Sequence, residues 1–295
     1  MDYTSRPFRS VLYIPGSKSR ALDKARQLPT DAIIFDLEDA VAAGEKDAAR
    51  DLLAKTLVDG GYGPRAQIVR INAFDTDWAE DDLAAIGPAA PQAVLLPKVN
   101  DADDIMRLEA RLDGIPAARD TRIWAMMETC EGVLNAREIA AASPRMAGFV
   151  LGTNDLAKEL TARLVPDRGP LMTSLSLCLL AARARGLVCV DGVYNAFKDA
   201  DGLRAECVQG RDMGFDGKTL IHPAQLEIAN TVYAPAEDEL DLARRQIAAF
   251  EAAEASGEGV AVVDGRIVEN LHVETARKTI ARAEAILKLE KESAA

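Results

Sequence analysis

The stretch AIIFDLEDAV, residues 32–41, places four apolar side chains directly before three carboxylates, Asp36, Glu38 and Asp39. An apolar, β-branched run of this kind predicts a buried strand. Three like charges within four positions repel one another, and burial increases the energetic penalty unless a cation neutralises them. A strand that simply reaches solvent would give the same pattern, so the rest of the chain has to decide between the two interpretations.

Short apolar runs like this one recur along the 295-residue chain, and stretches with helical spacing, such as residues 19–28 and 101–112, separate them. The other runs span residues 10–15, 66–72, 93–99, 122–128, 147–153, 187–193 and 216–223. Continuous apolar strands that alternate with helices imply a parallel sheet covered on both faces. Eight such units in about 220 residues favour a closed (β/α)8 TIM barrel, an α/β fold, over an open sheet. We expect this barrel to span residues 1–230.

Polar residues, in one case preceded by a glycine, occur at the end of every run. They are Gly16, Ser17, Lys18, Asp36, Glu38, Asp39, Arg70, Asn72, Lys98, Glu128, Asn154, Asp155, Asp191, Tyr194, Lys218 and His222. A barrel brings the carboxyl ends of all its strands to one mouth, where barrel active sites lie. We therefore expect the carboxylates of residues 36–39 to face a shared site that contains a cation.

The composition excludes several classes of function. A net charge of −12 argues against nucleic acid as the main partner, because phosphate binding needs a basic surface. The N-terminal segment lacks the apolar core of a signal peptide, and no apolar run approaches the length of a membrane span, about 20 residues. The four cysteines form no CxxC pair, which indicates reduced core thiols in a cytoplasmic protein. Two histidines are too few for a His-rich zinc site.

The chain leaves the barrel pattern after Pro223. Residues 237–255 read as a helix, residues 259–270 (GVAVVDGRIVEN) as strands around a DG turn, and the last segment as an amphipathic helix. We assign residues 231–295 to a C-terminal module that is too small for a separate core. We expect it to pack as a lid on its own barrel or on a neighbour's.

Glu128 and Asp155 end the fifth and sixth runs, so adjacent barrel strands would bring both carboxylates to one ion. Hard oxygen ligands without histidine suit Mg²⁺, or Mn²⁺, rather than zinc. Glu38 and Asp39 could then accept hydrogen bonds from metal-bound waters. The alternative is two unrelated acids that face solvent.

Three further segments have both a functional and a structural interpretation. Arg70 suits recognition of a substrate carboxylate or polarisation of a carbonyl, but could equally form an ion pair with Glu38 or another acid. The segment PGSKSRALDKA (15–25) resembles a phosphate site at a helix N-terminus, although solvated lysines are common in first helices. His222 could contact a ligand or be a hydrogen-bonded core histidine. No GxGxxG or Walker pattern occurs, so a dinucleotide or NTP fold is unsupported.

Taken together, the blocks around these residues resemble the citrate lyase β-subunit-like (HpcH/HpaI aldolase) family, which includes malyl-CoA and citramalyl-CoA lyases. The blocks are SVLYIPGSK (10–18), DAIIFDLEDAV (31–41), VRIN (69–72), LLPKV (95–99), METCEG (127–132), LGTNDLA (151–157), VDGVY (190–194) and GFDGKTLIHPAQ (214–225). They occur in order over nearly the whole chain. The resemblance implies a barrel with a C-terminal lid, usually in trimers or hexamers, that binds Mg²⁺ and an acyl-CoA.

The resemblance also implies roles for individual residues. Glu128 and Asp155 match the metal ligands, with Glu38 and Asp39 behind them, and Arg70 matches the arginine that contacts the acyl group or its carbonyl. The positions implied to bind CoA or the substrate are Tyr13, Lys18, Lys24, Asn154, Ile221 and His222.

One position departs from the family's lyases. Their lid carries a DG-x-x-x-D segment whose last aspartate reaches a neighbouring subunit's site and acts as acid or base. Here the segment reads DGRIVEN, and Glu269 takes that place. The extra methylene displaces the carboxylate by more than about an ångström, a scale to which general-base catalysis is sensitive.

The segment and the overall pattern look most like the family's (3S)-malyl-CoA thioesterase branch, which forms malate and CoA. The prediction is therefore Mg²⁺-dependent hydrolysis of (3S)-malyl-CoA, with Arg70 polarising the thioester and Glu269 as the base. One alternative is a lyase that cleaves malyl-, methylmalyl- or citramalyl-CoA to glyoxylate or pyruvate and an acyl-CoA. Another is a β-subunit that is either noncatalytic or bound to a scaffold, where it acts on carrier-protein thioesters.

Overall fold

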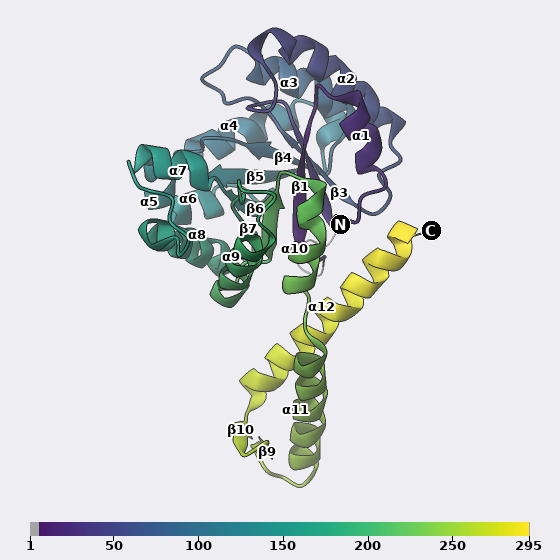
Figure 1. Cartoon of the computed structure of the whole chain (residues 1–295), viewed down its shortest axis with the longest axis vertical. Coiled ribbons are helices and arrows are strands. Elements are labelled where there is room, and N and C mark those ends of the chain that lie inside the picture. The colour runs from purple at the N-terminus through teal and green to yellow at the C-terminus, as the bar shows by residue number, and fades with distance from the viewer. Residues whose placement is uncertain (1–5, 295) are drawn as a thin grey trace. The chain divides into compact units, whose positions relative to one another are not determined.

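The computed structural model describes residues 6–294, and these residues divide into two compact units. One unit is Phe8–Tyr233, and the other contains residues 234–294. Figure 1 labels the helices and strands of both units. Among residues 6–294, no helix combines the length and the apolar composition needed to cross a membrane.

The described residues of the larger unit form a closed barrel of eight parallel strands, which confirms the predicted TIM barrel. Each strand pairs with the next in sequence, and the last closes on the first. The strands are β1 (Ser10–Pro15), β2 (Ala32–Asp36), β3 (Ala66–Arg70), β4 (Ala93–Leu96), β5 (Arg122–Met127), β6 (Met146–Leu151), β7 (Val188–Asp191) and β8 (Gly217–Leu220). Seven of the eight predicted apolar runs contain one of these strands, and β6 begins one residue before its run.

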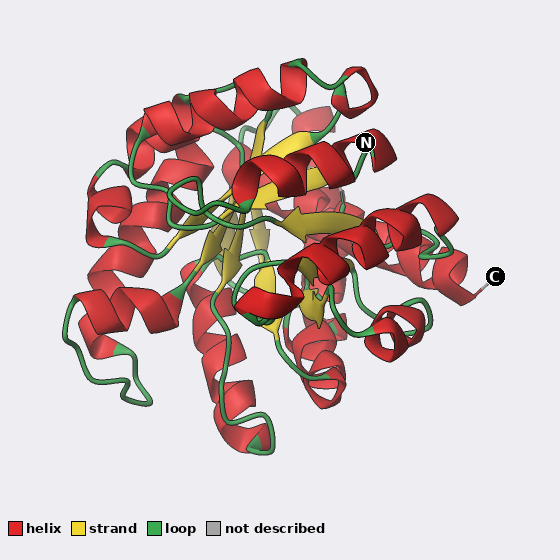
Figure 2. Cartoon of the chain, turned by 90° about the horizontal axis from the view of Figure 1, so that it is seen from above, coloured by secondary structure: helices red, strands yellow, loops and turns green. Residues whose placement is uncertain are grey.

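Helices connect the strands and enclose the barrel, as Figure 2 shows for the yellow strands and red helices of this unit. They are α1 (Ser19–Ala25), α2 (Lys46–Asp59), α3 (Ala79–Ile86), α4 (Ala102–Asp113), α5 (Cys130–Leu134), α6 (Ala136–Ala141), α7 (Thr153–Glu159), α8 (Met172–Ala184), α9 (Ala200–Met213) and α10 (Leu226–Val232). Short 3-10 turns span Ala43–Glu45, Gly87–Ala89, Pro116–Ala118, Gly169–Leu171 and Pro223–Gln225.

Helix α4 illustrates why these segments fold as they do. Asp101 precedes the helix, and its side chain accepts a hydrogen bond from the backbone N–H of Asp104 at 3.1 Å, which caps the first turn. Ile105, Leu108 and Leu112 share one face of the helix and are buried in the core. Burial of this apolar stripe holds the helix against the barrel.

Strand β2 is buried along its whole length between β1 and β3. Its pairing with β3 places Asp36 opposite Arg70, the last residue of each strand. The strand register therefore brings the first of the clustered carboxylates beside a guanidinium group.

The smaller unit consists of α11 (Glu237–Ala255), the antiparallel strands β9 (Ala261–Val263) and β10 (Arg266–Val268), and α12 (Asn270–Ala294). Asp264 and Gly265 form the predicted DG turn, with φ values of 50° and 74°. Contrary to the expectation from its length, the unit has a small apolar core of its own. That core contains Phe250, Ala253, Ala261, Val263, Val268 and Val273.

Candidate active site

A cavity of about 350 Å³ opens at the carboxyl ends of the barrel strands; we call it the mouth cavity. The residues from the sequence prediction that line it are Tyr13, Asp36, Asp39, Arg70, Asn154, Asp155 and Ile221. The others that line it are Pro15, Ala40, Met126, Leu151, Gly152, Thr153, Val193 and Asn195. The barrel thus brings predicted residues from five strand ends to one place.

Arg70 is buried at the end of β3 and is held by two acids. Its Nε and Nη2 groups donate to the two oxygens of Asp36 at 2.8 and 2.6 Å, and its Nη1 lies 2.8 Å from Glu38 Oε2. Burial alone would lower the pKa of Arg70, but Asp36 and Glu38 outweigh it and raise that pKa well above its usual value. The predicted ion pair with Glu38 therefore exists, while Asp36 is a partner that the sequence analysis did not assign.

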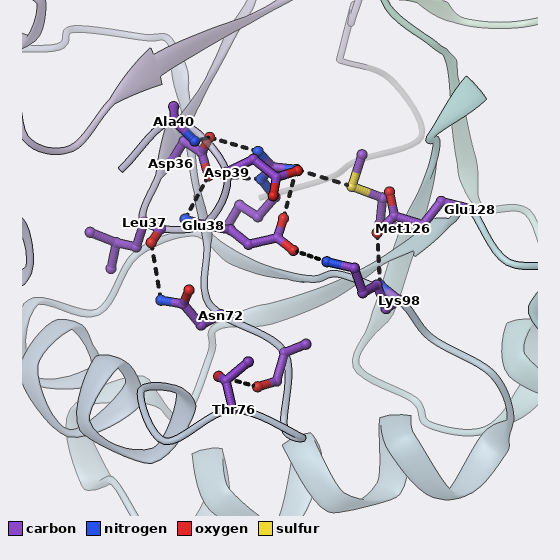
Figure 3. Close-up of polar contacts among 12 residues, drawn as sticks. Asp36, Leu37, Glu38, Asp39, Ala40, Asn72, Thr76, Lys98, Met126 and Glu128 are labelled. Atoms are coloured by element: carbon purple, nitrogen blue, oxygen red, sulfur yellow. Dashed lines mark hydrogen bonds and ion pairs between the residues drawn. The ribbon is translucent and has the colours of Figure 1, made fainter. Parts of the chain in front are cut away.

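Glu38 bridges Arg70 and Lys98. Its Oε1 accepts a hydrogen bond from Lys98 Nζ at 2.5 Å, and Figure 3 shows this contact beside Glu128. Burial raises the pKa of Glu38 despite the opposing effects of Arg70 and Lys98. Asp39 is different: its side chain is 63% exposed and its Oδ2 is 3.7 Å from Arg70 Nη1. The three clustered acids therefore do not simply reach solvent, because only Asp39 does so.

Lys98 follows β4 and adopts a left-handed backbone conformation, with φ of 51°. Residues other than glycine rarely adopt this conformation, and it costs about 1 to 3 kcal/mol. Here it directs the Lys98 backbone N–H to Glu128 Oε1, at 2.8 Å. Lys98 thus holds Glu128 with its backbone and Glu38 with its side chain, a double function that the sequence analysis missed.

Glu128 directly follows β5 and is 1% exposed. Its Oε2 is buried and has no hydrogen-bond partner among residues 6–294. Burial, followed by the charge of Glu38, raises the pKa of Glu128 to about 8, and Asp155 adds to the rise. A Cβ atom at Gly152 would lie 2.4 Å from Oε2, so only glycine permits this close approach. The fold therefore packs tightly around the Glu128 carboxylate, but its positive charges do not compensate for the burial of this group.

Asp155 lies in the first turn of α7, after β6, and lines the mouth cavity. Its charge contributes to the raised pKa of Glu128, so the two carboxylates are electrostatically coupled. Among the described residues, no group of three or more His, Cys, Asp or Glu side chains forms a metal cluster. Two carboxylates with a free buried oxygen fit Mg²⁺, which typically keeps several ligands from water and substrate.

Tyr13 lies inside the mouth, with the guanidinium carbon of Arg70 5.0 Å from its ring centroid. Burial raises the pKa of Tyr13 well above its usual value, although Arg70 opposes the rise. Lys18 and Lys24 are both exposed, and the ammonium of Lys18 is 3.6 Å from Glu45. The assignment of these three residues to CoA stays a prediction.

Of the remaining predicted contacts of the barrel, Asn154 lies in the first turn of α7, and Ile221 and His222 lie in the loop after β8. The Asn154 amide pairs with that of Asn195, and Ile221 is 41% exposed at the cavity. His222 is exposed: its Nδ1 accepts a hydrogen bond from the Ala224 N–H at 3.1 Å, and its ring stacks on Phe197. The alternative of a core histidine is therefore wrong, and a substrate contact by His222 stays a prediction.

Glu269 belongs to the smaller unit, where it directly precedes α12 and is exposed. Its backbone N–H donates to His272 Nδ1 at 3.0 Å. Its neighbours Val262, Ile267 and Leu271 are apolar and between 58% and 66% exposed. No hydrogen bond or ion pair of the Glu269 carboxylate occurs among the described residues of this unit, so its catalytic function stays a prediction.

Comparison with known proteins identifies the family. The model of the HpcH/HpaI aldolase/citrate lyase family matches residues 9–223. A (3S)-malyl-CoA thioesterase of Cereibacter sphaeroides is 65% identical over 286 residues, which cover 97% of this chain and 98% of that protein. A citrate lyase subunit beta of Escherichia coli is 35% identical over 285 residues, covering 95% of this chain and 94% of that protein.

A solved structure extends the likeness to three dimensions. CitE from Mycobacterium tuberculosis, in complex with magnesium, acetoacetate and coenzyme A, superposes with a TM-score of 0.78 at 31% identity. The match covers 95% of this chain and 99% of that one. With the family match over most of the chain and near full-length relatives, this chain belongs to the HpcH/HpaI aldolase/citrate lyase family.

Proposed function

We propose that the chain is a Mg²⁺-dependent thioesterase that hydrolyses (3S)-malyl-CoA to (S)-malate and CoA. The main supporting observation is the buried Glu128 carboxylate. Its Oε2 lacks a partner among the described residues, and the charge of Asp155 contributes to its raised pKa. The 65% identity to a (3S)-malyl-CoA thioesterase, over nearly the full length of both chains, selects hydrolysis from the reactions of the family.

Glu128 and Asp155 would hold the metal, and Mn²⁺ suits the same oxygen donors. Glu38 and Asp39 would accept hydrogen bonds from its waters. When bound, Mg²⁺ would supply a Lewis acid for the carboxylate and hydroxyl of the malyl group. Magnesium in the related CitE complex supports this assignment.

Arg70 would stabilise the negative charge that develops on the thioester oxygen. Because Asp36 holds its Nε and Nη2, the guanidinium is fixed in orientation before substrate arrives. In the hydrolysis, a water oxygen bonds to the carbonyl carbon, the carbon–sulfur bond breaks, and the sulfur leaves as the CoA thiolate, which takes up a proton to give the thiol. Glu269 would take the proton of the attacking water.

We further propose that Glu269 reaches the site from a neighbouring subunit of a homotrimer or hexamer. The exposed apolar side chains of Val262, Ile267 and Leu271 support a surface that another subunit covers. Tyr13, Lys18 and Lys24 would bind CoA, while Asn154, Ile221 and His222 would contact the substrate. All four cysteines carry free thiols, which supports a cytoplasmic location.

A lyase is the second candidate, because citrate lyase subunits are 35% identical to this chain. Incubation of purified protein with malyl-CoA and Mg²⁺ separates the candidates when free thiol and glyoxylate are measured together. CoA and malate without glyoxylate or acetyl-CoA support hydrolysis, whereas glyoxylate supports a lyase. No turnover would favour the third possibility, a subunit that acts on carrier-protein thioesters.

Substitution of Glu269 tests the proposed base. Glu269→Asp should shorten the side chain, misplace the carboxylate and lower hydrolysis by about 10- to 100-fold. Glu269→Ala should lower it at least as much while malyl-CoA binding is largely kept. Glu258→Ala, which removes another exposed acid of the same unit, is the matched control. Full activity in Glu269→Ala would show that this residue is not the base.

A further inference from the structure

Two hydrogen-bond donors in the mouth cavity share one acceptor, the sulfur of Met126. The Tyr13 hydroxyl donates to Met126 Sδ at 3.9 Å, and Arg70 Nη1 donates to the same atom at 3.7 Å. Tyr13 belongs to β1, Arg70 to β3 and Met126 to β5, and all three line the cavity. Side chains from alternate barrel strands share a layer of the barrel interior, so the fold directs these three groups toward one another.

The sulfur holds Arg70 only loosely. A thioether is a weak acceptor, and its contact is long compared with those that Arg70 makes to Asp36, at 2.8 and 2.6 Å. Arg70 Nη1 also pairs with Glu38, but this nitrogen carries two N–H groups, so one remains for the sulfur. Asp36 and Glu38 therefore fix the guanidinium, while one of its N–H groups faces a weak acceptor at the cavity.

The Tyr13 hydroxyl is even less firmly held. Among residues 6–294, the Met126 sulfur is its only hydrogen-bond acceptor. Burial raises the pKa of Tyr13 well above its usual value, so the hydroxyl keeps its proton near neutral pH. Tyr13 thus presents a proton donor beside Arg70 that an oxygen atom of a ligand would satisfy better than the sulfur does.

The proposed function places the thioester oxygen of the substrate at Arg70, and the present inference rests on that function. An oxygen that accepts from the loosely held N–H of Arg70 Nη1 lies near the point to which Tyr13 also donates. We propose that the Tyr13 hydroxyl donates a second hydrogen bond to the thioester oxygen. As water adds to the carbonyl carbon and negative charge collects on this oxygen, both donors stabilise the charge without having to reorient. Tyr13 is then a catalytic residue at the thioester end of the acyl-CoA.

The first test is the activity of Tyr13→Phe, which removes the hydroxyl and keeps the ring. This change should lower kcat for malyl-CoA hydrolysis, measured as free-thiol release, by about 100-fold, the loss expected for one oxyanion donor. Tyr62→Phe is the matched control and should leave kcat unchanged. It removes a buried hydroxyl that donates to the Leu22 carbonyl at 3.2 Å and lies outside the mouth cavity.

The second readout does not depend on turnover. Calorimetry compares two analogues of malyl-CoA: a ketone, in which a methylene replaces the sulfur, and a thioether, in which a methylene replaces the carbonyl. Tyr13→Phe should weaken binding of the ketone by about threefold to tenfold, the contribution of one neutral hydrogen bond, and leave binding of the thioether unchanged. Tyr62→Phe should change neither affinity.

A parental kcat in Tyr13→Phe, or an unchanged affinity for the ketone, would overturn the inference. An equal loss of affinity for both analogues would also overturn it, because the hydroxyl would then contact a part of CoA away from the carbonyl. Hydrolysis of malyl-CoA by the parent is scored separately, so each of these results in an active thioesterase leaves the proposed function intact. A parent that releases no CoA from malyl-CoA refutes that function and this inference with it.

Discussion

Two buried carboxylates at the ends of barrel strands, those of Asp191 and Glu128, differ in their cationic partners and in the direction in which the pKa is shifted. Asp191, at the end of β7, is fully buried and receives Arg168 Nη1 on both oxygens at 2.7 Å and Lys218 Nζ at 3.1 Å. Burial alone would raise the pKa of Asp191, but Lys218 and Arg168 outweigh it and lower that pKa. Glu128 is equally buried, yet its pKa is raised to about 8.

The difference in partners suggests which carboxylate stabilises the fold and which is a candidate for ligand binding. Where the chain supplies its own cations, the carboxylate joins a fixed ionic network that the fold satisfies internally. Where a buried carboxylate retains an oxygen without a partner in the described structure, either a proton or a bound cation has to neutralise it. By this reasoning we expect Asp191 to stabilise the fold, and the proposal that Glu128 binds a ligand implies a cost in stability.

The largest expected effect is the loss of activity when the metal site is altered. Glu128→Gln and Asp155→Asn each remove a formal charge with little change in volume. Each should lower malyl-CoA hydrolysis about a thousandfold at low Mg²⁺, because several kcal/mol of transition-state stabilisation are lost. Free-thiol release over a Mg²⁺ titration measures this.

Stability provides the other half of that test. Glu128→Gln should leave the free energy of unfolding within about 1 kcal/mol of the parent, because an uncharged group replaces a carboxylate that lacks a compensating cation. It should also lose the thermal stabilisation that Mg²⁺ gives the parent. Glu138→Gln, an exposed acid on α6, is the control. Near-parental activity of Glu128→Gln after EDTA treatment would refute the metal assignment.

Asp191→Asn should have the opposite profile. It leaves the buried cations Arg168 and Lys218 without their shared partner, which should lower the free energy of unfolding by about 3–5 kcal/mol. The fraction that remains folded at low temperature should still hydrolyse malyl-CoA with normal Mg²⁺ dependence. Urea unfolding and a Mg²⁺ titration of the same sample provide both readouts. Unchanged stability would mean that the network does not stabilise the fold.

The sequence predicts the barrel well and this contrast poorly. Apolar runs reflect burial directly, so each predicted run coincides with a strand to within a few residues. Asp191 and Glu128, however, look alike in sequence, since each ends an apolar run. Lys218 lies opposite Asp191 in the pairing of β7 with β8. It can be recognised as the ion-pair partner of Asp191 only when the order of the strands in the barrel is known.

Loop conformation hides the remaining partners. Arg168 reaches Asp191 from a loop where its own φ is 54°, and Lys98 reaches Glu128 with φ of 51°. Neither position is glycine, so composition gives no sign of a left-handed turn there. Asp36 was visible as an acid, but only the pairing of β2 with β3 shows that it holds Arg70. Side-chain partners therefore depend on backbone detail that hydrophobic periodicity does not encode.

The smallest expected effect is the pH dependence of the stabilisation that Asp191 gives to the folded state. The measured quantity is the gap in unfolding free energy between the parent and Asp191→Asn. Because the folded-state pKa of Asp191 lies below its unfolded value of about 3.9, its stabilisation is complete above that pH. It is lost as the pH falls toward the folded-state pKa, since the unfolded chain then binds a proton that the folded chain does not.

The gap should therefore be constant from about pH 8 to 5 and shrink below about pH 4, by up to about 1.4 kcal/mol per pH unit. The asparagine variant lacks the group in both states, so the titration of all other carboxylates cancels in the difference. Asp212→Asn, an exposed acid on α9, should give a gap near zero at every pH. A gap that widens on acidification would mean that burial dominates over Lys218 and Arg168, and that Asp191 resembles Glu128 after all.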